Sequence, residues 1–517
     1  MTAGATGVFG RRGPAARPAA ERFLGGEGGD RVQSALVGLG VVAVSLLAGA
    51  AVLDPRWSVL VLPAIGLSVL IGIAAVSRGA LVGFTVLGVL NGIPGLDLET
   101  FAVPGSFHPR DLLILFLIGA LVLWHFRTPA DLLDRRWLGL VRPWAFILVA
   151  WWLLTLARSV FFSDIPALQA ALFGRDFLYF GLLLPLLPVA FRRRSDLVAL
   201  LAVVGTAGTI FALAQTATSL FPSVSAVLDP SFLINETLTN EFEGVTRVYA
   251  YMGDVVVLGT IVAGGVAILA RSRRSRIVSS TLFVILTVGA LAQLSRAAYV
   301  AMLAGFLCVV LAALLRAAAP MGVLRRVMPA FVLVVALFPV LSLVHPSDTG
   351  SQSAAQVFAT RAESGIQEIQ ARSGTFGYRR EVQSEMLDLV GNRWPVGLGF
   401  WHPDARYVAA LPQGTIRNAD VGVLNGIMTI GAIGTILLYL PVLGTIVFLV
   451  RRRRHAREWD GVVLGACGWL FGVVVASISL VTLFTTPGLV LTAVVIVAAV
   501  SLATRPDAED PTAAERA

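Results

Sequence analysis

Long runs of apolar residues, separated by short polar segments, dominate the chain. A helix needs roughly 20 apolar residues to cross a hydrocarbon core about 30 Å thick. The run at 80–92 ends in NGIPG, which indicates a broken helix, and the run at 421–450 is long enough to tilt. The pattern predicts an all-α polytopic membrane protein with about fourteen transmembrane helices, at 34–53, 58–76, 80–92, 111–126, 141–157, 176–191, 197–217, 254–270, 277–294, 297–315, 327–344, 421–450, 461–484 and 489–504.

Polar segments set the expected domain organisation. Residues 1–33 are rich in Gly, Ala and Pro without an apolar core segment, so they predict a disordered cytoplasmic tail and not a signal peptide. Eleven helices follow at 34–344, then a large extracytoplasmic loop at 345–420 with short helices of its own. Three helices at 421–504 precede a second cytoplasmic tail at 505–517.

Composition and charge support this class and fix an orientation. Hydrophobic residues make up 56% of the chain and charged residues 14%, which excludes a soluble enzyme, a disordered regulator and a disulfide scaffold. All 40 basic residues are arginine, and 27 of them lie on the cytoplasmic side if the N-terminus does. An even number of helices then places both termini in the cytoplasm. The arginines are distributed according to the side of the membrane on which their segments lie. We therefore expect membrane lipids, and not nucleic acid, as partners.

The large loop contains a second periodic pattern. In RREVQSEMLDLV the apolar residues recur at helical spacing, and the acidic residues fall on another face. We expect an amphipathic helix that lies on the membrane or caps a cavity. The apolar residues are Val382, Met386, Leu389 and Val390, and the acidic ones are Glu381, Glu385 and Asp388. The Gly- and Pro-rich segment WPVGLGFWHPDARY follows and lets backbone approach a ligand closely.

A minority of arginines is predicted at the outer membrane edge, against the overall bias. A single arginine at this edge is explained by a long side chain that extends its charge to the membrane–water interface. Several together favour an anionic substrate, because guanidinium matches the geometry of phosphate oxygens. Arg296 is the most specific of them, since it lies at a tight turn between two helices. The set comprises Arg110, Arg158, Arg175, Arg247 and Arg296 at helix ends, with Arg379 and Arg380 in the loop.

Three motifs in order carry a resemblance to a known family. LSRAAYVAMLAGF begins a helix, YRREVQSEMLDLVGNRWPVGLGF lies in the large loop, and NADVGVLNGIMTIGAIG returns the chain to the membrane. Together they cover about 297 to 434. In this order the chain resembles the O-antigen ligase and O-antigen polymerase superfamily of bacterial membrane glycosyltransferases.

The resemblance implies a C-type glycosyltransferase architecture in a bacterial cytoplasmic membrane. The donor would be a glycan on undecaprenyl pyrophosphate and the acceptor another glycan or a lipid. Transfer would occur on the outer face, with inversion and without a metal or other cofactor. Polymerase and ligase share this donor and differ in the acceptor, for products such as an exopolysaccharide or another cell-envelope polysaccharide.

The resemblance also assigns residues. Arg296 matches the arginine of the first motif, and Arg380 or its neighbour Arg379 matches that of the loop. The family's frequent histidine falls at Asp420, which leaves the general base open; a carboxylate is able to act as a base, although nearby arginines weaken it. The alternative explanation of Asp420 is a helix N-cap at the membrane edge. Further candidates for the base or for substrate binding are Glu381, Glu385, His402, Arg175 and Arg247.

Metal binding has little support in the sequence. Cys308 and Cys467 lie inside apolar runs, and the remaining histidines show no ligand spacing. We therefore expect no metal site.

Two other functions fit a polytopic chain. A transferase that uses polyprenyl-phosphate sugars usually carries an acidic pair in its first outer loop, where this chain has only Asp54; Asp97 and Glu99 come one outer loop later. A lipid-linked glycan flippase or other transporter suits the number of helices. It is disfavoured because no charge is expected near the centre of a span and function is concentrated in one loop.

Overall fold

The computed structural model describes residues 69–93, 108–127, 135–163, 165–221, 239–242, 245–248, 251–270, 272–316, 320–346, 352–371, 383–384, 386–400, 422–451, 459–478 and 485–504. The chain divides into two compact units, residues 1–81 and 82–517. All contacts discussed below lie within the second unit.

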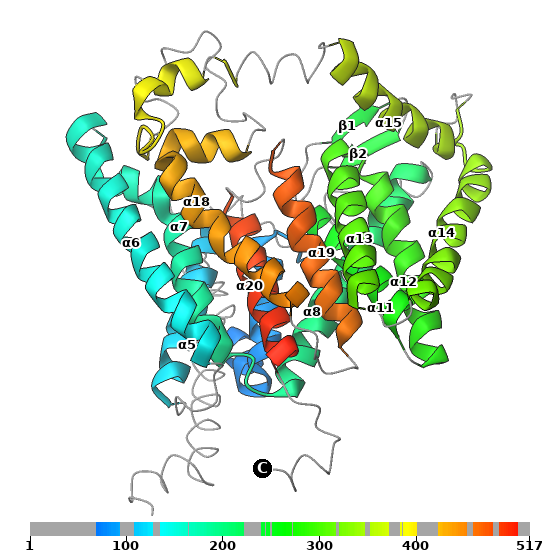
Figure 1. Cartoon of the computed structure of the whole chain (residues 1–517), viewed down its shortest axis with the longest axis horizontal. Coiled ribbons are helices and arrows are strands. Elements are labelled where there is room, and N and C mark those ends of the chain that lie inside the picture. The colour runs from blue at the N-terminus through cyan, green and yellow to red at the C-terminus, as the bar shows by residue number, and fades with distance from the viewer. Residues whose placement is uncertain are drawn as a thin grey trace, which may run out of the picture. The chain divides into compact units, whose positions relative to one another are not determined.

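Helices make up nearly all of the described structure (Figure 1). Nine of the described helices are long and apolar enough to cross a membrane, and α4 and α19 are shorter apolar helices. An all-α polytopic membrane protein is therefore confirmed, whereas the number fourteen stays a prediction. The helices are α4 (Arg78–Val89), α5 (Pro109–Arg127), α6 (Arg135–Ser163), α7 (Ala167–Leu186), α8 (Arg194–Leu220), α11 (Met252–Leu269), α12 (Arg273–Ala292), α13 (Arg296–Arg316), α14 (Pro320–Ser342), α15 (Ala354–Ala371), α18 (Gly422–Arg451), α19 (Asp460–Ala476) and α20 (Thr486–Thr504).

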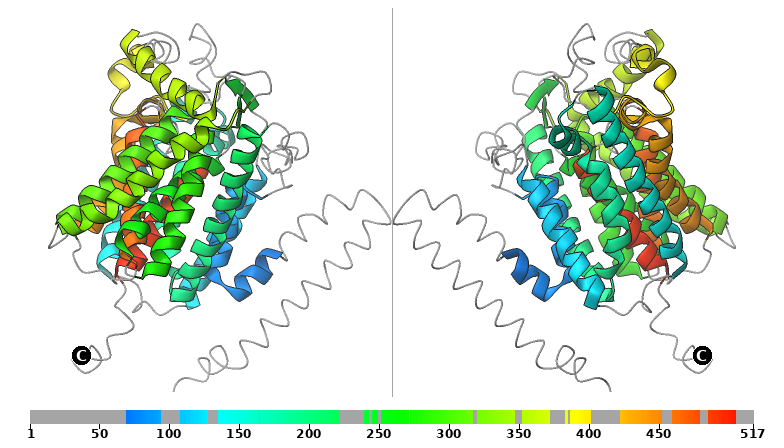
Figure 2. Two further views of the ribbon diagram at one scale, coloured as in Figure 1. Left: turned by 90° about the vertical axis from the view of Figure 1, so that its right-hand side faces the viewer. Right: turned by 90° about the vertical axis from the view of Figure 1, so that its left-hand side faces the viewer.

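Each predicted run from 80–92 onward overlaps one of these helices, while the run at 34–53 and most of 58–76 lie outside the described residues. Two elements were not placed by the sequence. One is α15, within the large loop, where short helices were expected but only the one near 380–390 was located. The other is an antiparallel hairpin of β1 (Thr239–Phe242) and β2 (Val245–Val248) between α8 and α11. Figure 2 shows the helices from two sides.

Helix α19 packs against α11 and α13 in the centre of the unit. Four glycines on α19 face these neighbours: Gly461 and Gly465 meet the backbone of α11, and Gly468 and Gly472 meet that of α13. A methyl group at any of the four positions would overlap main-chain atoms of the neighbouring helix. Small residues allow such close approach, which is a common basis of helix packing in lipid.

Helix α18 is broken at Gly431, where φ is 74° and ψ is 172°. Almost only glycine adopts this conformation. At the break, the N–H groups of the next two residues lose their usual carbonyl acceptors within the helix. Carbonyl groups of the loop at 394–400 take the place of those acceptors. The N–H groups of Ala432 and Ile433 donate to the carbonyl oxygens of Trp394 and Pro395, at 2.9 and 3.1 Å.

The carbonyl groups before the break are satisfied in the same way. The N–H of Leu398 donates to Met428 O (2.5 Å) and that of Gly399 to Thr429 O (3.0 Å). The indole of Trp151, on α6, donates to Ile430 O at 2.8 Å. Unpaired backbone groups are costly in lipid, so the break depends on these partners.

The described part of the predicted amphipathic helix packs as expected from its apolar spacing. Met386 and Val390 are buried together with Leu398, Leu424 and Met428, whereas the side chain of Asp388 is exposed. The helix therefore covers the first part of α18, next to the break.

We predict that Gly431→Ala destabilises the protein. The alanine methyl would overlap Pro395 O and the backbone of Val396, and the backbone conformation itself costs about 1–3 kcal/mol for a residue other than glycine. Thermal denaturation in detergent should show a lower Tm. Gly444→Ala on the same helix is the control, because no atom lies near that position and alanine there favours the helix. An equal Tm for both variants would contradict the proposed role of the break.

Candidate functional site

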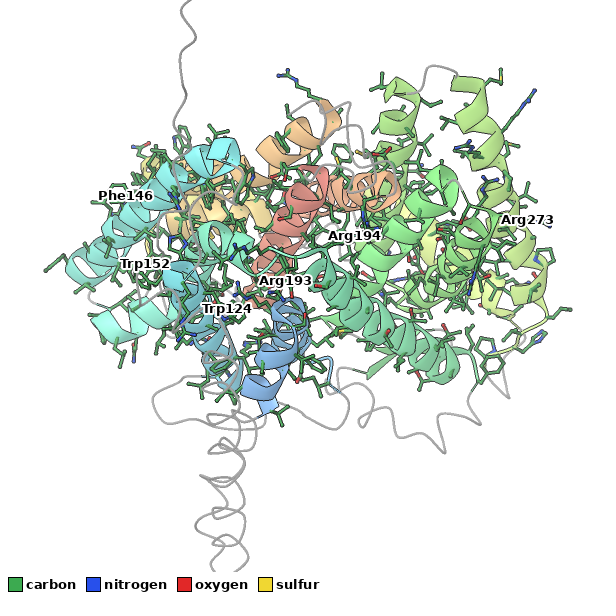
Figure 3. The ribbon with its side chains drawn as sticks, turned by 90° about the horizontal axis from the view of Figure 1, so that it is seen from below. Trp124, Phe146, Trp152, Arg193, Arg194 and Arg273 are labelled. Carbon is green, nitrogen blue, oxygen red and sulfur yellow. The ribbon has the colours of Figure 1, made fainter. Side chains whose placement is uncertain are left out.

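Successive helices run in opposite directions, so several arginines from distant segments share one end of the bundle. This is the end where α13 begins and α15 lies, which we call the α15 end; it is at the top of Figure 1. Arg193, Arg194 and Arg273 lie at the opposite end, which faces the viewer in Figure 3. The guanidinium of Arg194 stacks there on Trp459, with 5.5 Å between its central carbon and the ring centre.

Arg296 is the first residue of α13 and is paired with a carboxylate from α15. Its two terminal nitrogens each lie 2.7 Å from one oxygen of Glu368, and Nη2 also donates to Ser364 Oγ at 3.0 Å. Both charged side chains keep about a quarter of their surface exposed, 26% and 23%. Nε of Arg296 is buried and donates to no residue within the described part of the chain. The guanidinium is thus held by a two-pronged ion pair and stays partly accessible.

Helix α15 is positioned by features that do not involve this ion pair. Ser353 Oγ accepts a hydrogen bond from the N–H of Gln356, whose side-chain oxygen accepts one from the N–H of Ser353. This reciprocal arrangement is a capping box. Phe358 and Val357 are buried with Leu294 and Leu341, so the first turns of α15 pack on the ends of α12 and α14.

A second arginine of α15 lies beside Arg296. Nε of Arg361 donates to Leu294 O at 3.0 Å, and Ser364 Oγ donates to Arg361 O. Burial lowers the pKa of Arg361, and the positive charge of Arg296 lowers it further. The charges of Arg361 and Arg296 therefore lie close to each other at the start of α13.

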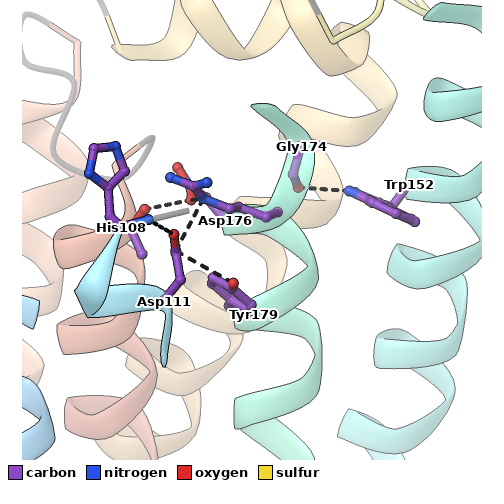
Figure 4. Close-up of polar contacts among 8 residues, drawn as sticks. His108, Asp111, Trp152, Gly174, Asp176 and Tyr179 are labelled. Carbon is purple, nitrogen blue, oxygen red and sulfur yellow. Dashed lines mark hydrogen bonds and ion pairs between the residues drawn. The ribbon is translucent and has the colours of Figure 1, made fainter. Parts of the chain in front are cut away.

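A separate polar network joins α5, α7 and α20 (Figure 4). Nε of Arg175 lies 3.1 Å from the fully buried carboxylate of Asp111 and 3.9 Å from that of Asp176. Asp111 also accepts a hydrogen bond from the N–H of His108, and the hydroxyl of Tyr179 lies 3.5 Å from it. Thr486 donates to Asp176 at 2.5 Å. Each charge in this network thus faces an opposite charge or a hydrogen-bond donor.

The network corrects one sequence interpretation. The sequence predicted a span from 176, with Arg175 at its edge, because a charged residue was taken as a boundary. Helix α7 begins nine residues earlier, at Ala167, so Arg175 and Asp176 lie inside the candidate span. Their partners Asp111 and Thr486 lie in the first turns of α5 and α20, so these charges are level with the starts of two neighbouring helices. An opposite charge on α5, that of Asp111, makes an internal arginine tolerable.

The loop at 394–400 connects the break in α18 to α6 and α7. The N–H of Phe400 donates to Ser159 Oγ at 2.6 Å, and its ring stacks on Phe177. The ring occupies the space left by Gly174, directly before Arg175. Arg158 reaches the same region, with Nη2 at 3.4 Å from Thr429 O.

The structure brings only some of the predicted site residues into described contacts. Arg296 and Arg175 belong to two different sets of contacts, and Arg247 lies in β2, opposite Asn240. Sequence analysis missed Arg361, Ser364 and Glu368; the pattern Ser-x-x-Gln at 353–356 was the available signal for their helix. The predictions for Arg379, Arg380, Glu381, Glu385, His402 and Asp420 lie outside the described residues.

No group of three or more metal-binding side chains occurs among the described residues. Cys467 is buried and Cys308 is partly buried, each within a helix.

Comparison with known proteins matches residues 281–439 to the family model described as O-antigen ligase. The match runs from α12 to the middle of α18, slightly under a third of the chain, and it confirms the resemblance to the O-antigen ligase superfamily. It contains Arg296, Arg361, Glu368 and Gly431, whereas the Arg175 network lies outside it. No curated protein matches the chain.

We predict that Asp111→Asn destabilises the protein because it removes the fully buried carboxylate that lies nearest to Arg175. Removing one partner of a buried ion pair costs about 3–5 kcal/mol. The exposed Asp388→Asn provides the control, with an expected change within about 0.5 kcal/mol. Thermal denaturation in detergent measures both. An unchanged Tm for Asp111→Asn would show that the network contributes little to stability.

Proposed function

We propose that this chain, a membrane glycan ligase or polymerase of the O-antigen ligase superfamily, transfers glycan from undecaprenyl pyrophosphate to a glycan or lipid acceptor. The observation that carries the proposal is Arg296. It lies within the matched segment, at the end of a membrane helix, where it binds two carboxylate oxygens through both terminal nitrogens. Phosphate oxygens present the same geometry to a guanidinium group.

The proposed reaction is a displacement at the anomeric carbon of the donor glycan. The acceptor hydroxyl oxygen forms the new bond to that carbon, and the bond from the carbon to the phosphate oxygen breaks. The bonding electrons leave with undecaprenyl pyrophosphate, and the hydroxyl proton passes to a general base. Attack opposite the leaving group inverts the configuration.

Stabilisation of the leaving pyrophosphate is the principal role that we assign to arginine. Negative charge grows on the phosphate as the bond breaks, and fixed cations at that place lower the barrier. Arg296 supplies such a charge, and Arg380 or Arg379 from the large loop is proposed to supply another.

Asp420 remains our proposal for the general base, with Glu385 and His402 as alternatives. It precedes α18 by two residues, and the first part of α18 is held by Leu398 and Gly399 through backbone hydrogen bonds. A base attached to so short a lead into a fixed helix would be held close to the α15 end. Asp420→Asn should accordingly reduce transfer far more than Asp388→Asn.

The distribution of arginine supports the proposed orientation. Arg193, Arg194 and Arg273 lie at the end opposite α15 (Figure 3), and the clusters to which they belong are typical of cytoplasmic loops. The α15 end would then face outward, in a bacterial cytoplasmic membrane, with both termini in the cytoplasm.

We predict that Arg296→Ala abolishes transfer while the protein still folds. Purified protein in liposomes would receive a labelled undecaprenyl-pyrophosphate oligosaccharide and excess chelator, with products resolved by size. A ladder of longer lipid-linked glycans indicates a polymerase, and one shift onto an added acceptor a ligase. Arg273→Ala, at the opposite end, is the control and should keep wild-type activity. The proposal fails if wild-type protein leaves authentic host donor and acceptor unchanged.

We also predict the orientation by labelling. In intact cells a cysteine at Ser351 should react with an impermeant thiol reagent, whereas a cysteine at Ser272, the exposed N-cap of α12, should react only after lysis. The opposite pattern would place the α15 end in the cytoplasm and contradict an outer-face reaction.

A further inference from the structure

We propose that the exposed turn at 391–394 binds a pyranose ring of the glycan, and that this ring stacks on the indole of Trp394. Asn392 and Arg393 form hydrogen bonds to the hydroxyl groups of the same sugar. This inference rests on the proposed function and names a sugar-binding site for it. The turn lies within the segment matched to the O-antigen ligase family.

The glycines that follow this turn face the protein and are not available to a ligand. A methyl group on Gly397 would overlap the backbone of α18, and one on Gly399 would overlap Ser159 Oγ. Residues 397–400 are all buried. The close approach that these glycines permit is therefore used for packing, and contact with a ligand falls to the exposed residues before them, at 391–394.

The turn presents an aromatic side chain and two polar side chains together. All four of its residues, from Gly391 to Trp394, are exposed, and Trp394 keeps 56% of its surface accessible although its ring is large and apolar. No heavy atom lies within 4 Å of the position that a methyl group on Gly391 would occupy, so there is open space beside the turn. A ligand therefore has access to a flat aromatic surface next to Asn392 and Arg393.

Hydrogen bonds hold the backbone of the turn in one conformation. Arg393 O accepts from the N–H groups of Val396 and Gly397, at 3.0 and 2.7 Å. The carbonyl groups of Trp394 and Pro395 accept from the two amides that follow the break in α18. Because this backbone is already ordered, a ligand that binds here does not have to order it, and such preorganisation favours affinity.

The combination of side chains matches the chemistry of a sugar. A pyranose ring has an apolar face of C–H groups, which packs on an aromatic ring, and hydroxyl groups around its edge. Indole provides a large flat surface, and amide and guanidinium groups provide hydrogen-bond donors at its side. A lipid chain would use the apolar surface alone, whereas a sugar uses Trp394, Asn392 and Arg393 together.

Transfer kinetics in liposomes show which sugar occupies the turn. Trp394→Leu keeps an apolar side chain but removes the flat ring. It should raise one KM about tenfold with little change in kcat, because it removes binding that the ground state and the transition state share. Trp394→Phe retains a smaller ring and should raise the same KM about two- to threefold. A higher KM for the donor places a donor sugar on Trp394, and a higher KM for the acceptor places an acceptor sugar there.

The control is another exposed aromatic residue at the same end of the bundle. Phe161 is 77% exposed and lies in the last turn of α6, the helix whose Ser159 holds Phe400. Phe161→Leu should leave kcat and both KM values as in the wild-type protein.

Binding of a sugar without lipid separates a carbohydrate site from a membrane anchor. The full-length protein in lipid nanodiscs would be titrated with the oligosaccharides released from the host's donor and acceptor, and in parallel with undecaprenyl pyrophosphate without glycan. Asn392→Ala, Arg393→Ala and Trp394→Leu should each weaken binding of one oligosaccharide by about threefold to tenfold. The same variants should leave binding of the lipid unchanged.

Two results would overturn the inference. In the first, Trp394→Leu leaves both KM values and oligosaccharide binding as in the wild-type protein. In the second, it weakens binding of the lipid but not of either oligosaccharide, which would make Trp394 a membrane anchor. A lower Tm identifies a variant that misfolds, in which case Asn392→Ala and Arg393→Ala, at exposed side chains, decide.

The titration also distinguishes failure of the inference from failure of the proposed function. If oligosaccharide binding depends on Trp394 but no transfer occurs, the sugar site stands and the transferase proposal falls. If transfer occurs and the variants change neither a KM nor oligosaccharide binding, the transferase proposal stands and the role of the turn falls.

Discussion

A backbone inside a membrane must satisfy its own hydrogen bonds, and the break in α18 meets this constraint with a second segment of chain. At Gly431 the loop at 394–400 provides carbonyl groups to the amides after the break, and its own amides bind the carbonyls before it. The loop is in turn held by Ser159 and by the ring of Phe400 in the space beside Gly174. Helices α6, α7 and α18 therefore meet at one polar junction, at the end of the bundle that we assign to substrate.

Two ion pairs at that end differ in how deeply the carboxylate is buried, and this difference separates the roles of their arginines. Arg175 faces a carboxylate with no exposed surface, and losing either partner removes the closest opposite charge from a buried network. Arg296 faces a carboxylate that is still partly exposed, on a helix held by other contacts. The first pair is suited to a permanent structural role, whereas the second is partly accessible from outside the protein. Their positions relative to the matched family segment agree with this division.

Hydropathy was sufficient to predict the helical class and the approximate position of each described membrane helix. It placed the start of α7 too late because Arg175 was treated as an end signal, while the compensating Asp111 lies on another helix, 64 positions earlier in the sequence. The motif with Arg296 was identifiable, but its partner Glu368 was not, since only the fold brings α15 to α13. Likewise Gly397 and Gly431 were visible as glycines, whereas their contact across the break required the structure.

The junction at Gly431 also affects which changes of loop length this protein can tolerate. Phe400 and the first turn of α18 are fixed to the same packed unit, so the chain between them starts and ends at neighbouring places. Closing a loop costs only about 0.6 kcal/mol more for each doubling of its length. Insertions or deletions between these two anchors would leave the transmembrane helices nearly undisturbed.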